Sequence, residues 1–287
     1  MIIGIKHLTP LRVHLCPFIL AVLTYYASIL LYSLRWMFVL RGLGREVKFK
    51  DALYGVLIGL SVNAVTPTSR AGGELARAVW LKLRTGISIT EALVSMIYER
   101  LLEGFPVSIL LIATVILFPI HRFLTALFTF LILFAISMFL MKYETIINVL
   151  SKRISKIRES REKLIILRKY KTANLIGICT SSIVWLLDIC RFKLLALSLS
   201  YPISWKIALL LSVSNLILSL ISLTPGGVGI VEGGLMGLLV ILGFPKWFSL
   251  SITILERFIS LILGPITGAI IIFLNGGLKL WKVLRSP

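Results

Sequence analysis

Residues 60–74 read LSVNAVTPTSRAGGE, and residues 218–232 read LSLISLTPGGVGIVE. Leu, Ser, Thr, Pro and Glu match between the two stretches at a constant separation of 158 positions. In both, an apolar run stops before a proline, because the residue that precedes proline is disfavoured in the α conformation. Roughly 25 residues further on, each copy reaches another apolar run that carries a Glu-Arg pair. A duplicated break beside a duplicated carboxylate is typical of the binding site of a membrane transporter.

The two breaks contain residues that interrupt helices. Proline lacks the backbone N–H that a helix needs, and glycine loses more conformational entropy than other residues when it becomes helical. Non-helical backbone at membrane depth is tolerated only where protein shields it or where it faces a water-filled cavity. We therefore expect broken or re-entrant segments at residues 66–74 and 224–232. The residues expected to form them are Pro67, Gly72, Gly73, Pro225, Gly226, Gly227 and Gly229.

The composition places the chain in a membrane. Hydrophobic residues make up 58% of the sequence, charged residues 15%, and the mean hydropathy is +0.98. An ordinary soluble domain carries about 25% charged residues. Several apolar runs reach the roughly 20 residues that a helix needs to cross a bilayer. The sequence thus predicts an all-α polytopic membrane protein, with about eight apolar helical elements forming one membrane domain over residues 1–287.

The repeat and the basic residues divide this domain. We expect repeat one at residues 10–141, a basic linker at 142–172 and repeat two at 173–280. The formal net charge of +19 comes without an aromatic-interleaved nucleic-acid motif, and the basic residues lie between apolar runs. This distribution is typical of cytoplasmic loops and of attraction to anionic lipids. The linker is therefore predicted to be an amphipathic helix on the cytoplasmic membrane surface, with a solvated linker as the alternative.

The relative orientation of the two repeats is only partly readable. The loop at residues 41–50 is strongly basic, whereas its counterpart at 201–206 carries one lysine. If the first loop is cytoplasmic and the second is outside, the repeats are inverted in the membrane, and we favour this arrangement. The basic C-terminal tail argues for parallel repeats. The sidedness of the termini stays open.

Six charged residues lie inside apolar runs or at the breaks. A charge at mid-bilayer costs about 2.5–3.5 kcal/mol, so six isolated charges would cost on the order of 15–20 kcal/mol. They must therefore pair, face a wet cavity or bind something. Neighbours on a helix point about 100° apart, so each Glu-Arg pair needs partners elsewhere. The candidates for a substrate path or charge network are Glu74, Glu99, Arg100, Glu232, Glu256 and Arg257, with Arg70 and Arg77.

Two readings of these charges remain. A structural lattice of ion pairs that holds the bundle together is the first. A substrate path is the second, and we favour it because duplicated charges beside duplicated breaks exceed what packing requires. The glutamates at the breaks can occupy the helix N-termini themselves, so contact with an anion would fall to the arginines. Asp188 and Arg191, three positions apart, are expected to form a local pair.

The sequence shows no sign of catalysis. Its three histidines are scattered without metal-ligand spacing, and neither a Ser-His-Asp arrangement nor a phosphate-binding loop is apparent. No hydrophilic segment is long enough to form a soluble catalytic domain. We therefore expect no enzymatic activity, no cofactor and no metal site.

At this point the sequence resembles a known family. The elements NAVTPTSRAGGELARA, the Tyr98-Glu99-Arg100 helix, LTPGGVGIVEGG and the run at Leu255-Glu256-Arg257 are similar to the lysylphosphatidylglycerol synthase transmembrane region, also called UPF0104 or the flippase-like domain family. The resemblance covers about residues 10–280. In two-domain bacterial members this region is associated with moving aminoacylated phospholipid between leaflets, while a soluble domain transfers the amino acid. The sequence ends at Pro287 without that domain, so the resemblance implies the translocation part rather than the synthase.

The expected function is a multi-pass lipid translocator in the cell membrane. The resemblance implies a phospholipid as cargo, or a polyprenyl-phosphate lipid, since related regions are fused to glycosyltransferases. The expected partners are membrane lipids that are anionic or carry phosphate, with no nucleic acid. The alternatives are an ion-coupled carrier of a small solute and a non-transporting partner subunit of a lipid-modifying enzyme. Cargo, energy coupling and oligomeric state are not in the sequence.

Overall fold

The computed structural model describes residues 13–67, 71–118 and 170–275. Within these ranges the regular structure is helical and includes no strand. Residues 119–169, which hold most of the predicted linker and the apolar run before it, lie outside the described residues. The helices are α1 (Leu15–Gly42), α2 (Phe49–Val65), α3 (Ala71–Thr85), α4 (Ile89–Leu117), α7 (Lys171–Ser198), α8 (Trp205–Ile221), α9 (Ile230–Ile241), α10 (Lys246–Arg257) and α11 (Gly264–Leu274), with the 3-10 turn η1 (Pro225–Gly227) and the π-helical turn η2 (Phe258–Leu263).

Four of the described helices are long and apolar enough to cross a membrane. They are α1, α4, α7 and the continuous helix Lys246–Leu274, which comprises α10, η2 and α11. Each has 28 or 29 residues, against the roughly 20 needed. The predicted class, an all-α polytopic membrane protein, is thus confirmed. By contrast, α3 has 15 residues and α9 has 12, and each begins inside the predicted break. Gly72 and Gly73, predicted to belong to the first break, are therefore part of the first turn of α3.

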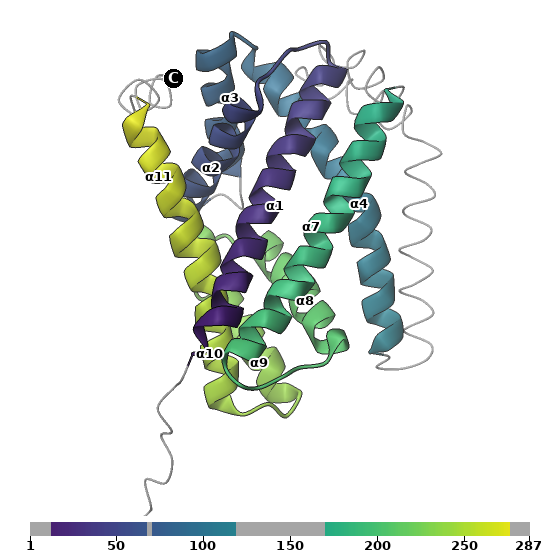
Figure 1. Cartoon of the computed structure of the whole chain (residues 1–287), viewed down its shortest axis with the longest axis vertical. Coiled ribbons are helices and arrows are strands. Elements are labelled where there is room, and N and C mark those ends of the chain that lie inside the picture. Colours follow the sequence, from purple (N-terminus) through teal and green to yellow (C-terminus); the bar gives the residue numbers. More distant parts are fainter. Residues whose placement is uncertain (1–12, 68–70, 119–169, 276–287) are drawn as a thin grey trace, which may run out of the picture.

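The first helices of the two halves pack side by side and run antiparallel (Figure 1). The backbone N–H of His14, at the start of α1, donates to the carbonyl of Ser198, at the end of α7, at 2.7 Å. In Figure 1, α2 and α3 lie toward one end of the bundle, and α8 and α9 lie toward the other. This arrangement is what inverted repeats produce, and we infer that the two halves are inverted.

The helix lengths repeat in the same order. α1 and α7 each have 28 residues, and α2 and α8 each have 17. Their starting positions differ by 156 residues, whereas the prolines of the breaks differ by 158. Two extra residues therefore separate the end of α8 from its proline. Within the first helices the equivalent of Arg35 is Arg191. Lys193, which matches Arg35 at the 158-residue spacing of the breaks, instead donates to the carbonyl of Ile203 and lies over the ring of Trp205.

The two halves also interlock through α2 and α11. The hydroxyl of Ser61 on α2 donates to the carbonyl oxygen of Pro265 at 2.5 Å. Gly268, three residues further on, lies directly against α2, and a Cβ atom there would overlap the carbonyl oxygen of Leu57. Backbone cannot move aside as a flexible side chain can, so this contact requires glycine.

We predict that Gly268→Ala destabilises the protein. Overpacking a tight contact costs about 1–3 kcal/mol, and 1 kcal/mol corresponds to roughly 2–4 °C in a chain of this size. Thermal unfolding of the purified protein in detergent measures this loss. Gly237→Ala is the matched control, because a Cβ there meets nothing within 4 Å and alanine is the better helix former. Equal unfolding temperatures for the two variants would contradict the close approach of α2 and α11.

Candidate functional site

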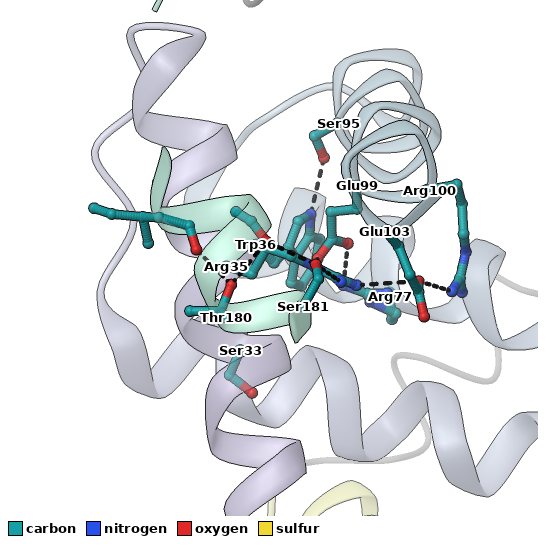
Figure 2. Close-up of polar contacts among 12 residues, drawn as sticks. Ser33, Arg35, Trp36, Arg77, Ser95, Glu99, Arg100, Glu103, Thr180 and Ser181 are labelled. Carbon is teal, nitrogen blue, oxygen red and sulfur yellow. Dashed lines mark hydrogen bonds and ion pairs between the residues drawn. The ribbon is translucent and has the colours of Figure 1, made fainter. Parts of the chain in front are cut away.

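Glu99, on α4, lies at the centre of the charge network of the first half (Figure 2). Its side chain is 2% exposed, and each carboxylate oxygen has its own arginine. Nε of Arg35 on α1 lies 3.1 Å from Oε1, and Nη2 of Arg77 on α3 lies 2.9 Å from Oε2. Arg35 also approaches Glu103 at 3.5 Å and donates to the hydroxyl of Ser181 on α7 at 2.7 Å. Three helices of one half and one helix of the other therefore meet around a single carboxylate.

Packing fixes the two arginines of Glu99 in place. The guanidinium of Arg77 lies 4.1 Å from the ring centroid of Trp36. The indole N–H of Trp36 in turn donates to the hydroxyl of Ser95 at 2.8 Å. Gly59 leaves room for the Arg77 stem, because a Cβ there would come within 2.8 Å of its Cγ. This inner cluster is thus held rigidly from several sides.

Glu256, on α10, occupies the equivalent place in the second half, with a weaker set of partners. Its side chain is 0% exposed, and its Oε1 lies 3.4 Å from Nη2 of Arg191 on α7 and 3.5 Å from Nδ2 of Asn215 on α8. The same Nη2 of Arg191 lies 2.5 Å from Asp188, which also accepts a bond from Ser212 at 2.6 Å. The local pair predicted between Asp188 and Arg191 is confirmed, and Arg191 reaches Glu256 as well.

The second residue of each Glu-Arg pair bonds to the glutamate of its own break. Arg100 lies 3.1 Å from Glu74, and Nε of Arg257 lies 2.7 Å from Glu232. These outer pairs are more accessible than the inner ones, since the side chain of Arg100 is 43% exposed and those of Glu74 and Glu232 about a third. Each Glu-Arg helix therefore carries one buried carboxylate and one arginine that reaches the surface of the site.

The second break brings its glutamate to the start of α9. Gly226, Gly227 and Gly229 all have positive φ angles, which L-residues with side chains rarely adopt. The backbone N–H of Gly229 donates to Oε2 of Glu232 at 2.6 Å, so this carboxylate caps the helix, as the sequence predicts. Arg257 closes the arrangement by donating to the carbonyl oxygen of Gly226.

The two halves enclose one cavity of about 290 Å³. Its walls come from α1, α2, α3, α4, α7 and α8, from both breaks and from the helix that carries Glu256. A cavity with charges of both signs at its walls is the alternative to isolated burial that the energetics require. The charged residues at its walls are Arg35, Glu74, Arg77, Glu99, Arg100, Glu103, Asp188, Arg191, Glu256 and Arg257.

Several buried polar atoms of the lining residues have no hydrogen-bond partner within the described part of the chain. Three are N–H donors: Nε of Arg77, Nε1 of Trp185 and Nε of Arg191. Two are acceptors, Oδ1 of Asn215 and Oε2 of Glu256, and the hydroxyl of Ser260 can both donate and accept. Buried polar groups are normally satisfied, so such atoms around a cavity indicate a place for solvent or a ligand.

The structure brings together nearly all of the candidate residues. Glu74, Glu99, Arg100, Arg77, Glu256 and Arg257 line the cavity, and Glu232 is bonded to Arg257. Arg70 lies outside the described residues. Four members of the site were not predicted from the sequence. They are Arg35, Glu103, Asn215 and Arg191, whose contact with Glu256 was not expected. The 156-residue spacing between Arg35 and Arg191 could have identified them as equivalent, but the alignment of the two halves was based on the 158-residue spacing of the breaks.

The described residues include no group of three or more His, Cys, Asp or Glu side chains that could hold a metal ion. The site is instead built from arginines, carboxylates, hydroxyls and amides. Such a set can bind phosphate through guanidinium groups and cations through oxygen atoms.

A comparison with models of protein families identifies the family of this chain. The family model of the lysylphosphatidylglycerol synthase transmembrane region matches residues 6–268. The chain belongs to this family. The match covers every element that contributes to the cavity, so the family and the site coincide along the sequence.

Several archaeal proteins are similar over most of the chain. The UPF0104 membrane protein PH1989 of Pyrococcus horikoshii is 27% identical over 90% of this chain and 86% of its own length. A UPF0104 membrane protein of Methanothermobacter thermautotrophicus is 26% identical over 84% of this chain and 80% of its own. The UPF0104 membrane protein MJ1595 of Methanocaldococcus jannaschii is 27% identical over 83% and 78%. No solved structure matches significantly. The chain is thus a multi-pass membrane protein of this family.

We predict that Glu99→Gln unfolds the protein at lower temperature than any change at the outer pairs. Removing one member of a buried ion pair costs about 3–5 kcal/mol, because the remaining charges stay buried without compensation. Here two arginines would lose their carboxylate. Thermal unfolding and folded yield in detergent measure this loss. Glu46→Gln, an identical change in the exposed loop before α2, is the control and should stay within about 0.5 kcal/mol of the parent. Equal stability of the two variants would refute the central role of Glu99.

Proposed function

We propose that this chain is a lipid translocator, which lets the headgroup of a phospholipid or polyprenyl-phosphate lipid cross the cell membrane through the cavity between its two halves. It would perform this transfer without changing the lipid chemically. The observation that carries the proposal is the cavity itself. Charged residues of both halves line it, and Arg100 and Arg257 occupy equivalent positions on its two Glu-Arg helices.

The burial of the charges divides them into two roles. The inner pairs, Arg35 with Glu99 and Arg191 with Glu256, are buried, and each joins two helices of its own half. Of the outer arginines, Arg100 is 43% exposed, whereas Arg257 is 12% exposed and its partner Glu232 is 31% exposed. A guanidinium group binds phosphate oxygens in a bidentate fork, so Arg100 and Arg257 are suited to contact a headgroup phosphate.

The donors without partners favour the same cargo. Arg77, Trp185 and Arg191 each place a buried N–H with no acceptor among the described residues at the cavity. A phosphate or hydroxyl group of a headgroup supplies acceptors of this kind. Glutamates at the outer pairs would keep an anionic headgroup from binding too tightly to leave.

The cavity volume suits part of a lipid. About 290 Å³ lies near the lower end of the roughly 300–1,000 Å³ that small-ligand sites occupy. Such a space accommodates a headgroup, while the acyl or prenyl chains would remain in the surrounding bilayer. This division is what a translocator requires, because moving the chains through protein would serve no purpose.

Two other functions remain as alternatives. An ion-coupled carrier of a small solute would use the same cavity, and the acceptors near Glu256 favour its ion dependence. A partner subunit of a lipid-modifying enzyme would not transfer lipid alone. Proteoliposomes that contain only this protein separate these functions, because only a translocator moves fluorescent lipid between leaflets there.

We predict that Arg100→Gln and Arg257→Gln each lower lipid transfer by at least roughly tenfold, since losing one charge-assisted contact of about 1.5–3 kcal/mol corresponds to a factor of ten or more. Transfer is measured in proteoliposomes per folded molecule, with thermal unfolding of the same preparations. Arg84→Gln is the matched control, because Arg84 pairs with Asp51 at 3.4 Å outside the cavity.

The two interpretations of the charge network predict different effects of these variants on lipid transfer and on unfolding temperature. A headgroup path predicts lost transfer with little change in unfolding temperature, because the outer pairs are partly exposed. A structural lattice predicts the reverse, with stability lost and transfer per folded molecule unchanged. Unchanged transfer by both well-folded variants would reject the headgroup path.

A further inference from the structure

The two inner carboxylates are compensated unequally, although they occupy equivalent places. Glu99 has one arginine on each carboxylate oxygen. Among the described residues, the arginine that pairs with Glu256 is Arg191, on Oε1 and at the longer distance of 3.4 Å, and it is shared with Asp188. Oε2 of Glu256 is fully buried and has no hydrogen-bond partner among the described residues. Within the described ranges, this side therefore has one positive charge fewer than the first half.

Residue differences between the halves explain the missing charge. By the 158-residue spacing of the breaks, the place of Arg77 is taken by Leu235, which is apolar and buried. Gly59, which gives Arg77 its room, corresponds to Asn215 at the spacing of α2 and α8. The second half thus has a leucine in place of the arginine and an uncharged amide in place of the glycine, beside the carboxylate.

The charges of the two clusters confirm this imbalance. In the first half, three arginines face three glutamates at 2.9–3.5 Å and the formal charges cancel. In the second half, the described ion pairs join two arginines to three carboxylates, which leaves one negative charge. An uncompensated buried charge is costly, so a cation is expected at this place.

Two further oxygen atoms accompany Oε2 of Glu256. Oδ1 of Asn215 is buried and lacks a partner in the described part of the chain, and the hydroxyl of Ser260 lies within reach of the Glu256 carboxylate. Both residues line the same cavity. The amide of Asn215 lies next to the carboxylate, since its Nδ2 is 3.5 Å from Oε1. Ser260 lies four residues beyond Glu256, inside the π-helical turn η2. Turns of this kind occur frequently at functional sites.

We propose that Glu256, Asn215 and Ser260 form a binding site for a small monovalent cation, either Na⁺ or a proton. A carboxylate, an amide carbonyl and a hydroxyl are hard oxygen ligands of the type that a small cation prefers. A proton on Oε2 would neutralise the same charge and could be donated to Oδ1 of Asn215. The cation replaces the second arginine that Glu99 has and Glu256 lacks.

The surroundings of the site leave room for this charge. The groups that face it are Arg191 and Asp188 from α7, Arg257 from its own helix and the phenol of Tyr25 from α1, whose ring lies 5.5 Å from the guanidinium of Arg191. Arg191 is engaged by Asp188, and Arg257 by Glu232. Both arginines therefore pair with other carboxylates, and the negative charge near Oε2 is left for a cation to neutralise.

The test is thermal unfolding of the purified protein in detergent. NaCl is compared with choline chloride at equal ionic strength, and a pH series is recorded without Na⁺. If Na⁺ binds, the unfolding midpoint rises by about 2–4 °C once Na⁺ exceeds its Kd roughly fivefold. If a proton binds, the midpoint falls as pH rises, because the folded chain holds a proton that the unfolded chain releases. Binding is measured without lipid transfer, so it stands or falls separately from the proposed function.

Variants decide whether the response belongs to this site. Glu256→Gln should remove the Na⁺ response or flatten the pH slope, and Ser260→Ala should weaken the Na⁺ response if the cation is Na⁺. Ser251→Ala is the control on the same helix, because its hydroxyl bonds only to the carbonyl of Trp247 and lies outside the cavity lining. If Glu256→Gln does not fold, Asn215→Ala replaces it. The absence of both responses in the parent protein, or a response that survives in Glu256→Gln, would overturn the site. So would a response only to an added amine-bearing lipid, because the acceptors would then belong to the cargo.

Discussion

The structure depends on the need to compensate charges that lie inside an apolar bundle. Glu99 is almost fully buried, and it is tolerable only because Arg35 and Arg77 reach both of its oxygens from different helices. Each arginine is therefore also a constraint on helix position. A helix that moved by one turn would leave a charge unpaired at a cost of several kcal/mol. The ion pairs thus determine how α1, α3 and α4 are placed, and through Ser181 they extend to α7.

The breaks and the charges support one another. Helices that stop at Pro67 and Pro225 leave polar backbone inside the bundle, which requires a cavity or polar partners. Arg100 and Arg257 bond to the glutamates that follow the breaks, and Arg257 also bonds to backbone there. The short helices α3 and α9 are thereby fixed at one end. The walls of the cavity therefore combine these breaks with side chains that are held by ion pairs.

The sequence was sufficient for the class, the breaks and the identity of most buried charges, because hydropathy, proline and isolated charges act locally or through a simple energetic cost. The sequence did not show which side chains pair with these buried charges. Arg191 was recognised as the local partner of Asp188, yet its contact with Glu256 depends on how α7 packs against α10. Two extra residues before Pro225 shift the register between helix and break, so that Lys193 matched Arg35 by spacing although Arg191 is its equivalent. Such shifts become visible only once helix ends are known.

The antiparallel contact of α1 with α7 has a consequence for how such a chain could be assembled. Arg35 on α1 bonds to Ser181 on α7, and Arg191 on α7 lies against the ring of Tyr25 on α1. Arg35 and Arg191 are 156 residues apart, and so are Tyr25 and Ser181, so the two contacts are equivalent by the internal repeat. They therefore form a self-complementary surface of the kind that relates the subunits of a twofold dimer. A half-length chain that inserted in both orientations could build the same bundle from two copies, and fusing the copies is what allows one carboxylate to lose its second arginine while the other keeps it.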